Sequence, residues 1–178
     1  MNRVWRIALA AAFLLIPTAF GQWAATGTTQ LQVTVGPEAA LLINTATTAL
    51  TTPGTVFTDY TGTTSFSYKI RTNSGTHGGN ITLEVTTDFA PAGGPSVGTP
   101  PSAGDTLTYT CTVAAPGTGC SGTVTASTTA ATSVATFGAS AHSAKAGNAG
   151  STAWDLTNDP TYVVGTYNAT VTYTISLT

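Results

Sequence analysis

The two cysteines of the chain, Cys111 and Cys120, are its clearest candidates for chemistry. Both lie on the apolar parity of alternating segments, and the turn-forming residues 114–119 separate those segments. This arrangement predicts a disulfide between two strands that are joined by a turn. A redox or metal-binding pair is the alternative, but the sequence lacks the Cys-x-x-Cys spacing and the further ligands that such a pair needs.

Other side chains that could bind or react are few and scattered. His77 and His142 lie in glycine-rich segments without a neighbouring nucleophile or a metal-binding spacing, and we expect both to be exposed. Asp155, Asn158 and Asp159 could supply oxygen ligands to Ca²⁺. They could equally be turn residues that bond to their own backbone. The sequence predicts no catalytic, cofactor-binding or metal site, and we expect the protein not to be an enzyme.

The first residues have the pattern of a secretory signal peptide. Two arginines precede the apolar run of residues 7–16, and Ala19 and Gly21 supply the small residues before a cleavage site. The run is shorter than the roughly 20 apolar residues that a membrane-spanning helix needs. We therefore expect residues 1–21 to be removed on a bacterial Sec-type route. The product would be secreted, extracellular or at the cell surface, without membrane insertion.

The composition of residues 22–178 favours strands and a structural role. Threonine accounts for 39 of these 157 residues, and charged residues are 7% of the whole chain against roughly 25% in ordinary soluble domains. Threonine is β-branched and suits a pleated, half-exposed surface. Lys69, Arg71 and Lys145 are the only cations after the predicted cleavage site, which argues against nucleic acid as a partner. This composition is typical of extracellular structural proteins.

Alternating segments predict the elements that position these residues. The clearest is the closing strand, in which Tyr167, Val171, Tyr173, Ile175 and Leu177 share one apolar face. Further strands are expected over residues 30–35, 64–72, 80–87, 105–113 and 120–126, with shorter segments at 39–43, 56–59 and 133–137. Segments rich in glycine, proline and small residues, 88–104 and 138–152, are expected to be loops.

These segments predict an all-β fold, an immunoglobulin-like antiparallel β-sandwich of about seven to eight strands with long Gly/Pro/Thr-rich loops. The expected organisation is a signal peptide (1–21), a flexible leader (22–29) and one sandwich domain (30–178). Tyr167 fits a tyrosine corner, in which a tyrosine at a strand start bonds back to the backbone. An ordinary core tyrosine is the alternative. Trp154 is expected in the core.

The last fourteen residues resemble the final strand of bacterial secreted sandwich proteins of the spore-coat-U and chaperone–usher fimbrial type. In those families a glycine at the fourteenth position from the end and an aromatic residue at the penultimate one are usual. Gly165 occupies the first place, whereas Leu177 stands at the second. The resemblance implies a pilin-like sandwich that a donor strand from the next subunit completes. Leu31, Val33 and Val35 would be the donated residues, and the closing strand would accept them.

The sequence leaves three functions open. The first is a structural or adhesive subunit of an extracellular fibre or cell-surface layer, without a cofactor, which self-associates or joins other surface proteins through its N-terminal strand. The second is a carbohydrate-binding, lectin-like module. Tyr68, Tyr109, Tyr167 and Tyr173 fall on apolar parities, which counts against an exposed aromatic row on a strand. The third is a secreted sandwich that does not assemble.

Overall fold

The computed structural model describes residues 26–54, 56–75 and 77–178. The chain divides into two units, residues 1–34 and 35–178. In the first unit, residues 26–34 have no regular secondary structure, and the predicted signal peptide lies outside the described residues. Among the described residues there is no helix, and so none with the length and apolar character to cross a membrane.

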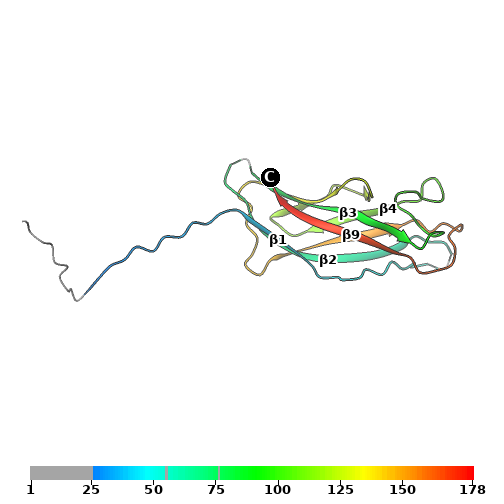
Figure 1. The fold of residues 1–178 in the computed structure, drawn as a ribbon, viewed down its shortest axis with the longest axis horizontal. Coiled ribbons are helices and arrows are strands. Elements are labelled where there is room, and N and C mark those ends of the chain that lie inside the picture. Colours follow the sequence, from blue (N-terminus) through cyan, green and yellow to red (C-terminus); the bar gives the residue numbers. More distant parts are fainter. Residues whose placement is uncertain (1–25, 55, 76) are drawn as a thin grey trace, which may run out of the picture. The chain divides into compact units, whose positions relative to one another are not determined.

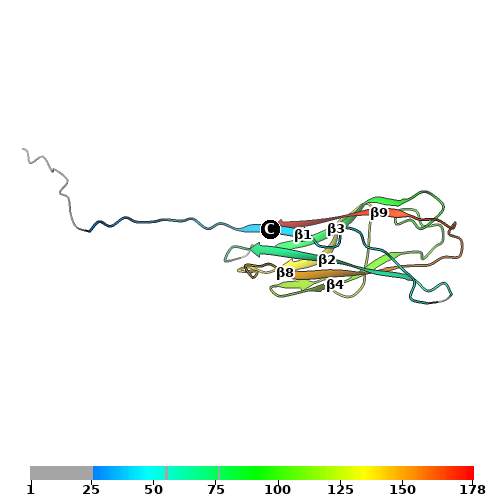
Figure 2. The ribbon, with the colours of Figure 1, turned by 90° about the horizontal axis from the view of Figure 1, so that it is seen from below.

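The second unit is a sandwich of two antiparallel sheets, which confirms the predicted fold class with nine strands instead of seven or eight. One sheet has the order β1-β2-β8-β4-β6 and the other the order β5-β7-β3-β9. Figure 2 shows β3 and β9 in one layer and β2, β8 and β4 in the other. The strands are β1 (Glu38–Ile43), β2 (Tyr60–Arg71), β3 (Gly79–Ala90), β4 (Leu107–Val113), β5 (Gly117–Gly119), β6 (Val124–Thr125), β7 (Thr132–Phe137), β8 (Asn148–Leu156) and β9 (Asn168–Leu177).

The core lies between the sheets and follows the predicted parity. Alternate residues of β2 and β3 point inward, and the most deeply buried side chains come from these strands and from β4, β7 and β8. Three aromatic pairs pack in it, with ring centroids 5.0–5.9 Å apart. The largest fully buried residues are Phe66, Tyr68, Ile81, Leu83, Val85, Tyr109, Val134 and Thr152.

Strand β8 corrects the prediction of a loop over residues 138–152. It lies inside the five-stranded sheet and pairs with β2 on one side and β4 on the other. Its inward positions include Gly150 and Thr152, which carry no apolar signal in the sequence. Glycine is required because a Cβ at residue 150 would come within 2.3 Å of the Phe66 ring. Small inward residues in this strand therefore make room for large ones on β2.

The disulfide between Cys111 and Cys120 is confirmed, but the predicted hairpin is wrong. After β4 the chain crosses to the other sheet, where β5 pairs with β7. It then returns, and the two-residue strand β6 pairs with β4. The disulfide therefore joins β4 of one sheet to the residue that follows β5 of the other. It links the two sheets, where the sequence predicted a link between neighbouring strands of one hairpin.

Two other predicted strands do not form within the chain. Residues 30–35 make no strand in the structure, and neither do the described residues among 56–59. Strands β2 and β3 are longer than predicted, at twelve residues each. The loop after β3 is fixed by Asp88, whose carboxylate accepts hydrogen bonds from the backbone of Val97 and Gly98 and from Ser96 Oγ at 2.6–3.0 Å.

Candidate functional site

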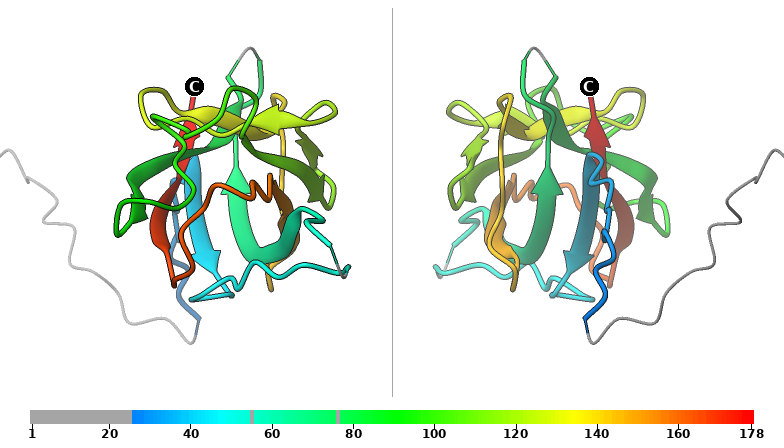
Figure 3. Two further views of the ribbon diagram at one scale, coloured as in Figure 1. Left: turned by 90° about the vertical axis from the view of Figure 1, so that its right-hand side faces the viewer. Right: turned by 90° about the vertical axis from the view of Figure 1, so that its left-hand side faces the viewer.

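The two lateral sides of the sandwich differ in how the sheets meet. On one side, the disulfide joins β4 to the end of β5. On the other side, the outer strands β1 and β9 contact each other without pairing, and Figure 3 shows them next to each other at the margin of the fold. We call this second side the open side. Each of its two outer strands has one edge of backbone N–H and C=O groups without a strand partner.

The inward face of β9 is incompletely covered. Its apolar residues Ala169, Val171, Tyr173 and Ile175 are all only half-buried. The facing residues of the neighbouring strand β3 are almost fully buried, and Ile81, the register partner of Ile175, is 0% exposed. Because both strands contribute to the same sheet and the same core, the difference arises from the lack of a neighbour beyond β9.

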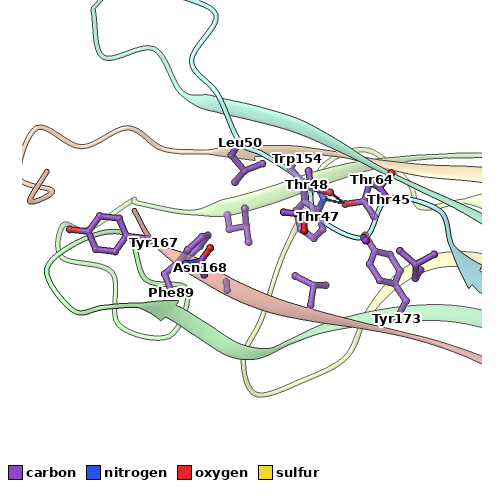
Figure 4. A pocket seen from close by; sticks show the side chains of 15 residues that line it. Thr45, Thr47, Thr48, Leu50, Thr64, Phe89, Trp154, Tyr167, Asn168 and Tyr173 are labelled. Atoms are coloured by element: carbon purple, nitrogen blue, oxygen red, sulfur yellow. Dashed lines mark hydrogen bonds between the residues drawn. The ribbon is translucent and has the colours of Figure 1, made fainter. Parts of the chain in front are cut away.

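A cleft opens between the start of β9 and the segment that follows β1. Its volume is about 330 Å³. Figure 4 shows its side chains, with Trp154 and Thr64 on one wall and Tyr173 and Asn168 on the other. We call it the side cleft; its lining residues are Ile43, Thr45, Ala46, Thr47, Thr48, Leu50, Thr64, Phe89, Leu107, Trp154, Tyr167, Asn168, Ala169, Val171 and Tyr173.

The wall of the side cleft is fixed by hydrogen bonds between buried polar groups. Trp154 Nε1 donates to Thr64 Oγ1 at 2.9 Å, and Thr64 Oγ1 shares a second hydrogen bond of 2.6 Å with Thr48 Oγ1 (Figure 4). Tyr173 Oη and Thr152 Oγ1 are 2.6 Å apart. Burial raises the pKa of Tyr173, and its hydroxyl stays neutral at physiological pH. The lining is therefore uncharged and preorganised, as a site for apolar side chains requires.

The outer edge of β2 is covered along the cleft by residues 44–51, which form no strand there apart from one bridge. Asn44 N and Thr45 N donate to the carbonyl oxygen of Ser65, and Thr45 Oγ1 accepts from Ser65 N. Thr51 and Thr61 exchange both backbone bonds at 2.8 and 2.9 Å. Because these residues occupy the β2 edge, an added strand at the open side would have to pair with β9 or with the outer edge of β1.

The predicted tyrosine corner is present at the start of β9. Tyr167 Oη donates a hydrogen bond of 2.6 Å to the backbone carbonyl of Val163, four residues upstream. The ring covers Gly94, where a Cβ would come within 2.4 Å of it. This pair positions the first residues of β9 against the long loop and so fixes one end of the side cleft.

The structure brings together only some of the predicted acceptor residues. Tyr167, Val171 and Tyr173 line the side cleft. Ile175 packs against the core farther along β9, and Leu177 lies at the opposite end of the strand, where it lines a separate small pocket with residue His77. Gly165 lies in the loop before β9, outside the lining of the side cleft.

Sequence reasoning missed the opposite wall of the side cleft. Thr45, Thr48 and Leu50 come from a segment outside the predicted strands, and Phe89 comes from the end of β3, within the predicted loop 88–104. The signal that could have found this wall is the short apolar run 39–43, which becomes β1 and leads directly into it. No periodicity marks the residues after Ile43, because the covering segment is not a strand.

The predicted donor residues are strongly exposed. Leu31 is 92% exposed, Val33 is 83% exposed, and Val35 is also exposed. Residues 26–37 carry no regular secondary structure. These three apolar side chains at alternate positions are therefore largely exposed to solvent, and their entry into another subunit stays a prediction.

The remaining polar candidates have structural contacts. Asp159 Oδ1 accepts a hydrogen bond from Thr161 N at 2.6 Å, as predicted for a turn residue. Asn158 Nδ2 donates a hydrogen bond of 3.1 Å to the backbone carbonyl of Thr58. Within residues 26–54, 56–75 and 77–178, no group of three or more His, Cys, Asp or Glu side chains could hold a metal ion. His77 and His142 are exposed, as expected.

Comparison of the chain with protein-family models, with curated proteins and with solved structures finds no match.

Proposed function

We propose that this protein is a secreted structural or adhesive subunit of an extracellular fibre or cell-surface layer. Subunits would join when the N-terminal segment of one copy, residues 30–35, enters the side cleft of the next and pairs with β9. The proposal rests on two complementary features of one chain. Within the described residues, the apolar alternating segment 30–35 joins no sheet, and the edge strand β9 has an apolar inward face that is only half-buried.

The physical case rests on two kinds of contact. The outer edge of β9 would supply backbone hydrogen bonds to an added strand, while half-buried apolar positions would receive alternate side chains. Leu31, Val33 and Val35 have the required two-residue spacing. Each large aliphatic side chain that moves from water into the cleft would contribute up to about 1.5–3 kcal/mol.

The absence of charge along β9 also favours this function. Exposed strand edges in monomeric proteins are usually guarded by lysine, proline or inward-pointing charge. Strand β9 contains no charged residue and no proline over Asn168–Leu177. An edge of this kind, ten residues long, is suited to pairing with another chain.

Compartment and family resemblance agree with this proposal. The disulfide between Cys111 and Cys120 is of the kind that persists in oxidising compartments, and the first 21 residues have the sequence pattern of a signal peptide. The position of Gly165 relative to the end of the chain matches the spore-coat-U and fimbrial-subunit pattern described above. Identical subunits are therefore the first partners to test.

The deciding experiment compares the full-length secreted protein with the variant Val33→Asp by negative-stain microscopy and unheated SDS gels. We expect filaments or SDS-resistant ladders from the wild type and none from Val33→Asp, because a buried unpaired carboxylate would prevent insertion. Gln32→Asp is the matched control. It adds the same charge one residue away, on the parity that would face solvent.

Two results would count against the proposal. Monodisperse wild-type protein at high concentration would remove self-assembly itself. Equal loss of polymers in Val33→Asp and Gln32→Asp would show that added charge controls assembly, whichever face of residues 30–35 carries it. A synthetic peptide of residues 28–37 should also bind a subunit that lacks residues 22–35, and the same peptide with Val33→Asp should not.

A further inference from the structure

A second hollow lies at the end of the sandwich where β8 ends and β9 begins. It has a volume of about 590 Å³, within the range of about 300–1,000 Å³ that is typical of small-molecule sites. Most of its lining comes from residues 47–50, 57–60 and 156–168, and the turn between β8 and β9 lies at the right-hand end of the fold in Figure 1, away from the C-terminus. We call it the end hollow. The assembly proposal leaves its outward-facing residues without a role.

Aromatic rings dominate the wall of the end hollow. Phe57, Tyr60, Tyr162 and Tyr167 all line it, each from a different turn or strand start. Tyr162 and Tyr167 are held by hydrogen bonds from their hydroxyls to Asp105 Oδ2 at 3.1 Å and to the carbonyl of Val163 at 2.6 Å. Their rings are thereby fixed in place, and the hydroxyls point at the protein, which leaves ring carbon to face a ligand.

Phe57 combines a strained backbone conformation with an exposed side chain. Its φ angle is +41°, a left-handed conformation that is strained for a bulky side chain. Its side chain is 61% exposed, so core packing does not explain the strain. Val163 and Val164 on the facing loop are also exposed. An exposed apolar rim at one end of a soluble domain is typical of an interaction site.

Most polar groups of the hollow are uncharged. Thr47, Thr166 and Asn168 line it, and within the described part of the chain their side chains make no hydrogen bond. Asp159 is its charged residue, and its Oδ1 already accepts a hydrogen bond from Thr161 N. An anionic ligand would meet a carboxylate and no lysine or arginine, so the lining disfavours an anion, and the free hydroxyls and amide suit a neutral ligand.

We propose that the end hollow binds an uncharged carbohydrate. A neutral sugar ring has an apolar C–H face, which packs on aromatic carbon, and a rim of hydroxyls, which hydroxyl and amide side chains can bind. The hollow offers both, with aromatic rings from Phe57 and Tyr60 and polar groups from Asn168, Thr47 and Thr166. Tyr167 and Asn168 line the side cleft as well, but Phe57, Tyr60 and Thr166 line only the end hollow, so substitutions at those three residues test the sugar site separately from assembly.

The test is binding of the full secreted protein to an array of neutral oligosaccharides of hexoses, pentoses and N-acetylhexosamines, followed by titration calorimetry on the sugars retained. We expect Phe57→Ala to weaken binding by about tenfold, since it removes one stacked ring. Leu42→Ala is the matched control and should leave affinity unchanged. Leu42 is 63% exposed, about as much as Phe57 at 61%, but it lies on β1 outside the hollow.

A second variant and a second measurement protect the test from misfolding. Thr166→Ala removes an exposed hydroxyl that lines only the end hollow and should also weaken binding, while circular dichroism checks that both variants fold. Amide chemical shifts in the mature protein should change on sugar addition at residues 56–60 and 158–168. The proposal is overturned if no neutral sugar binds at millimolar concentration, if polygalacturonate binds more tightly than neutral sugars, or if Phe57→Ala and Leu42→Ala behave alike. Filament formation should be unaffected by Phe57→Ala, so failure here leaves the assembly proposal standing.

Discussion

The two lateral sides of this sandwich solve the same problem in different ways. At each side the sheets end and the core between them must be covered. On the side of β4, β5 and β6, the chain crosses between sheets and a disulfide between Cys111 and Cys120 fastens them. On the open side, β1 and β9 meet without pairing and leave apolar side chains half-buried. The covalent link is on the side where the chain itself crosses between the sheets.

This difference indicates that the open side is not simply an unfinished part of the fold. On the other side the chain crosses between the sheets and the disulfide links them, although Val113 and Val124 there are also only partly buried. The open side carries the longest uncharged strand edge and the cleft. Strand exchange between subunits requires one side that is permanently linked and one side that can accept a strand. The following predictions test that contrast.

The largest stability difference should come from two isoleucines that face each other across one ladder. Ile81 on β3 and Ile175 on β9 are register partners in the same sheet, but only Ile81 is fully buried. In the monomer, Ile81→Ala should cost about 2–5 kcal/mol and Ile175→Ala about half as much, because part of Ile175 already contacts water. Urea unfolding of the variants, both lacking residues 22–35, measures the difference.

The same pair distinguishes monomer from assembly. In polymers the cost of Ile175→Ala should rise toward that of Ile81→Ala, because a donated strand would bury the Ile175 side chain. Equal costs in the monomer would mean that β9 is as well covered as β3 and that the open side is closed.

Loss of the disulfide should weaken the covered side and spare the open one. The double variant Cys111→Ala, Cys120→Ala releases a link between residues nine apart, which should cost about 2–3 kcal/mol in the chain-entropy model. Calorimetry should show a melting temperature lower by roughly 5–10 °C for a domain of this size. The affinity of the folded variant for the peptide of residues 28–37 should be unchanged. A large loss of peptide affinity would show that the two sides are coupled.

A smaller effect on the open side should appear in acid. Partial burial raises the pKa of Asp88, but hydrogen bonds from Ser96, Val97, Gly98 and Phe89 outweigh it and lower the pKa below its ordinary value. A carboxylate with a lowered folded pKa stabilises the fold above its unfolded pKa, near 4. That stability is lost as the pH falls through the folded value. The loop after β3 should therefore loosen below about pH 4.

The variant Asp88→Asn measures this contribution. Its urea midpoint should lie below that of the wild type at pH 7, and the two should converge as the pH falls through the lowered folded pKa of Asp88. Asp155→Asn is the contrasting control, because burial and the nearby Asp59 raise the pKa of Asp155. Its midpoint difference from the wild type should not shrink in acid in the same way. A pH-independent effect of Asp88→Asn would mean that its charge is not what holds the loop.

The sequence predicted the parts of the fold in which alternation and burial coincide. Strand β9 was predicted within one residue, because each inward position from Ala169 to Ile175 is apolar and each outward one is polar. Strand β8 was missed, although it is central, because Gly150 and Thr152 occupy inward positions. Their small volume is dictated by Phe66 on β2, and only the pairing of strands reveals that relation.

The candidate site was predictable only in part for a similar reason. The acceptor residues on β9 follow from parity, but the opposite wall comes from residues 44–50, which lack periodicity and are held by single hydrogen bonds to β2. The disulfide followed from the presence of two cysteines. Its role between sheets did not, because a two-residue strand such as β6 gives no pattern that distinguishes a hairpin from a crossing.

The start of β1 has a mechanical consequence if subunits join as proposed. Tension along a fibre would enter each subunit at residue 35 and pass directly into β1, three residues farther on. There Arg71 Nε donates to the carbonyl of Gly36 at 2.7 Å, and its guanidinium contacts Glu38 at 3.1 Å. The load would reach the six-residue ladder between β1 and β2 before any other element, and would bypass the disulfide. Hydrogen bonds, and not the covalent link, would then set the force at which a subunit yields.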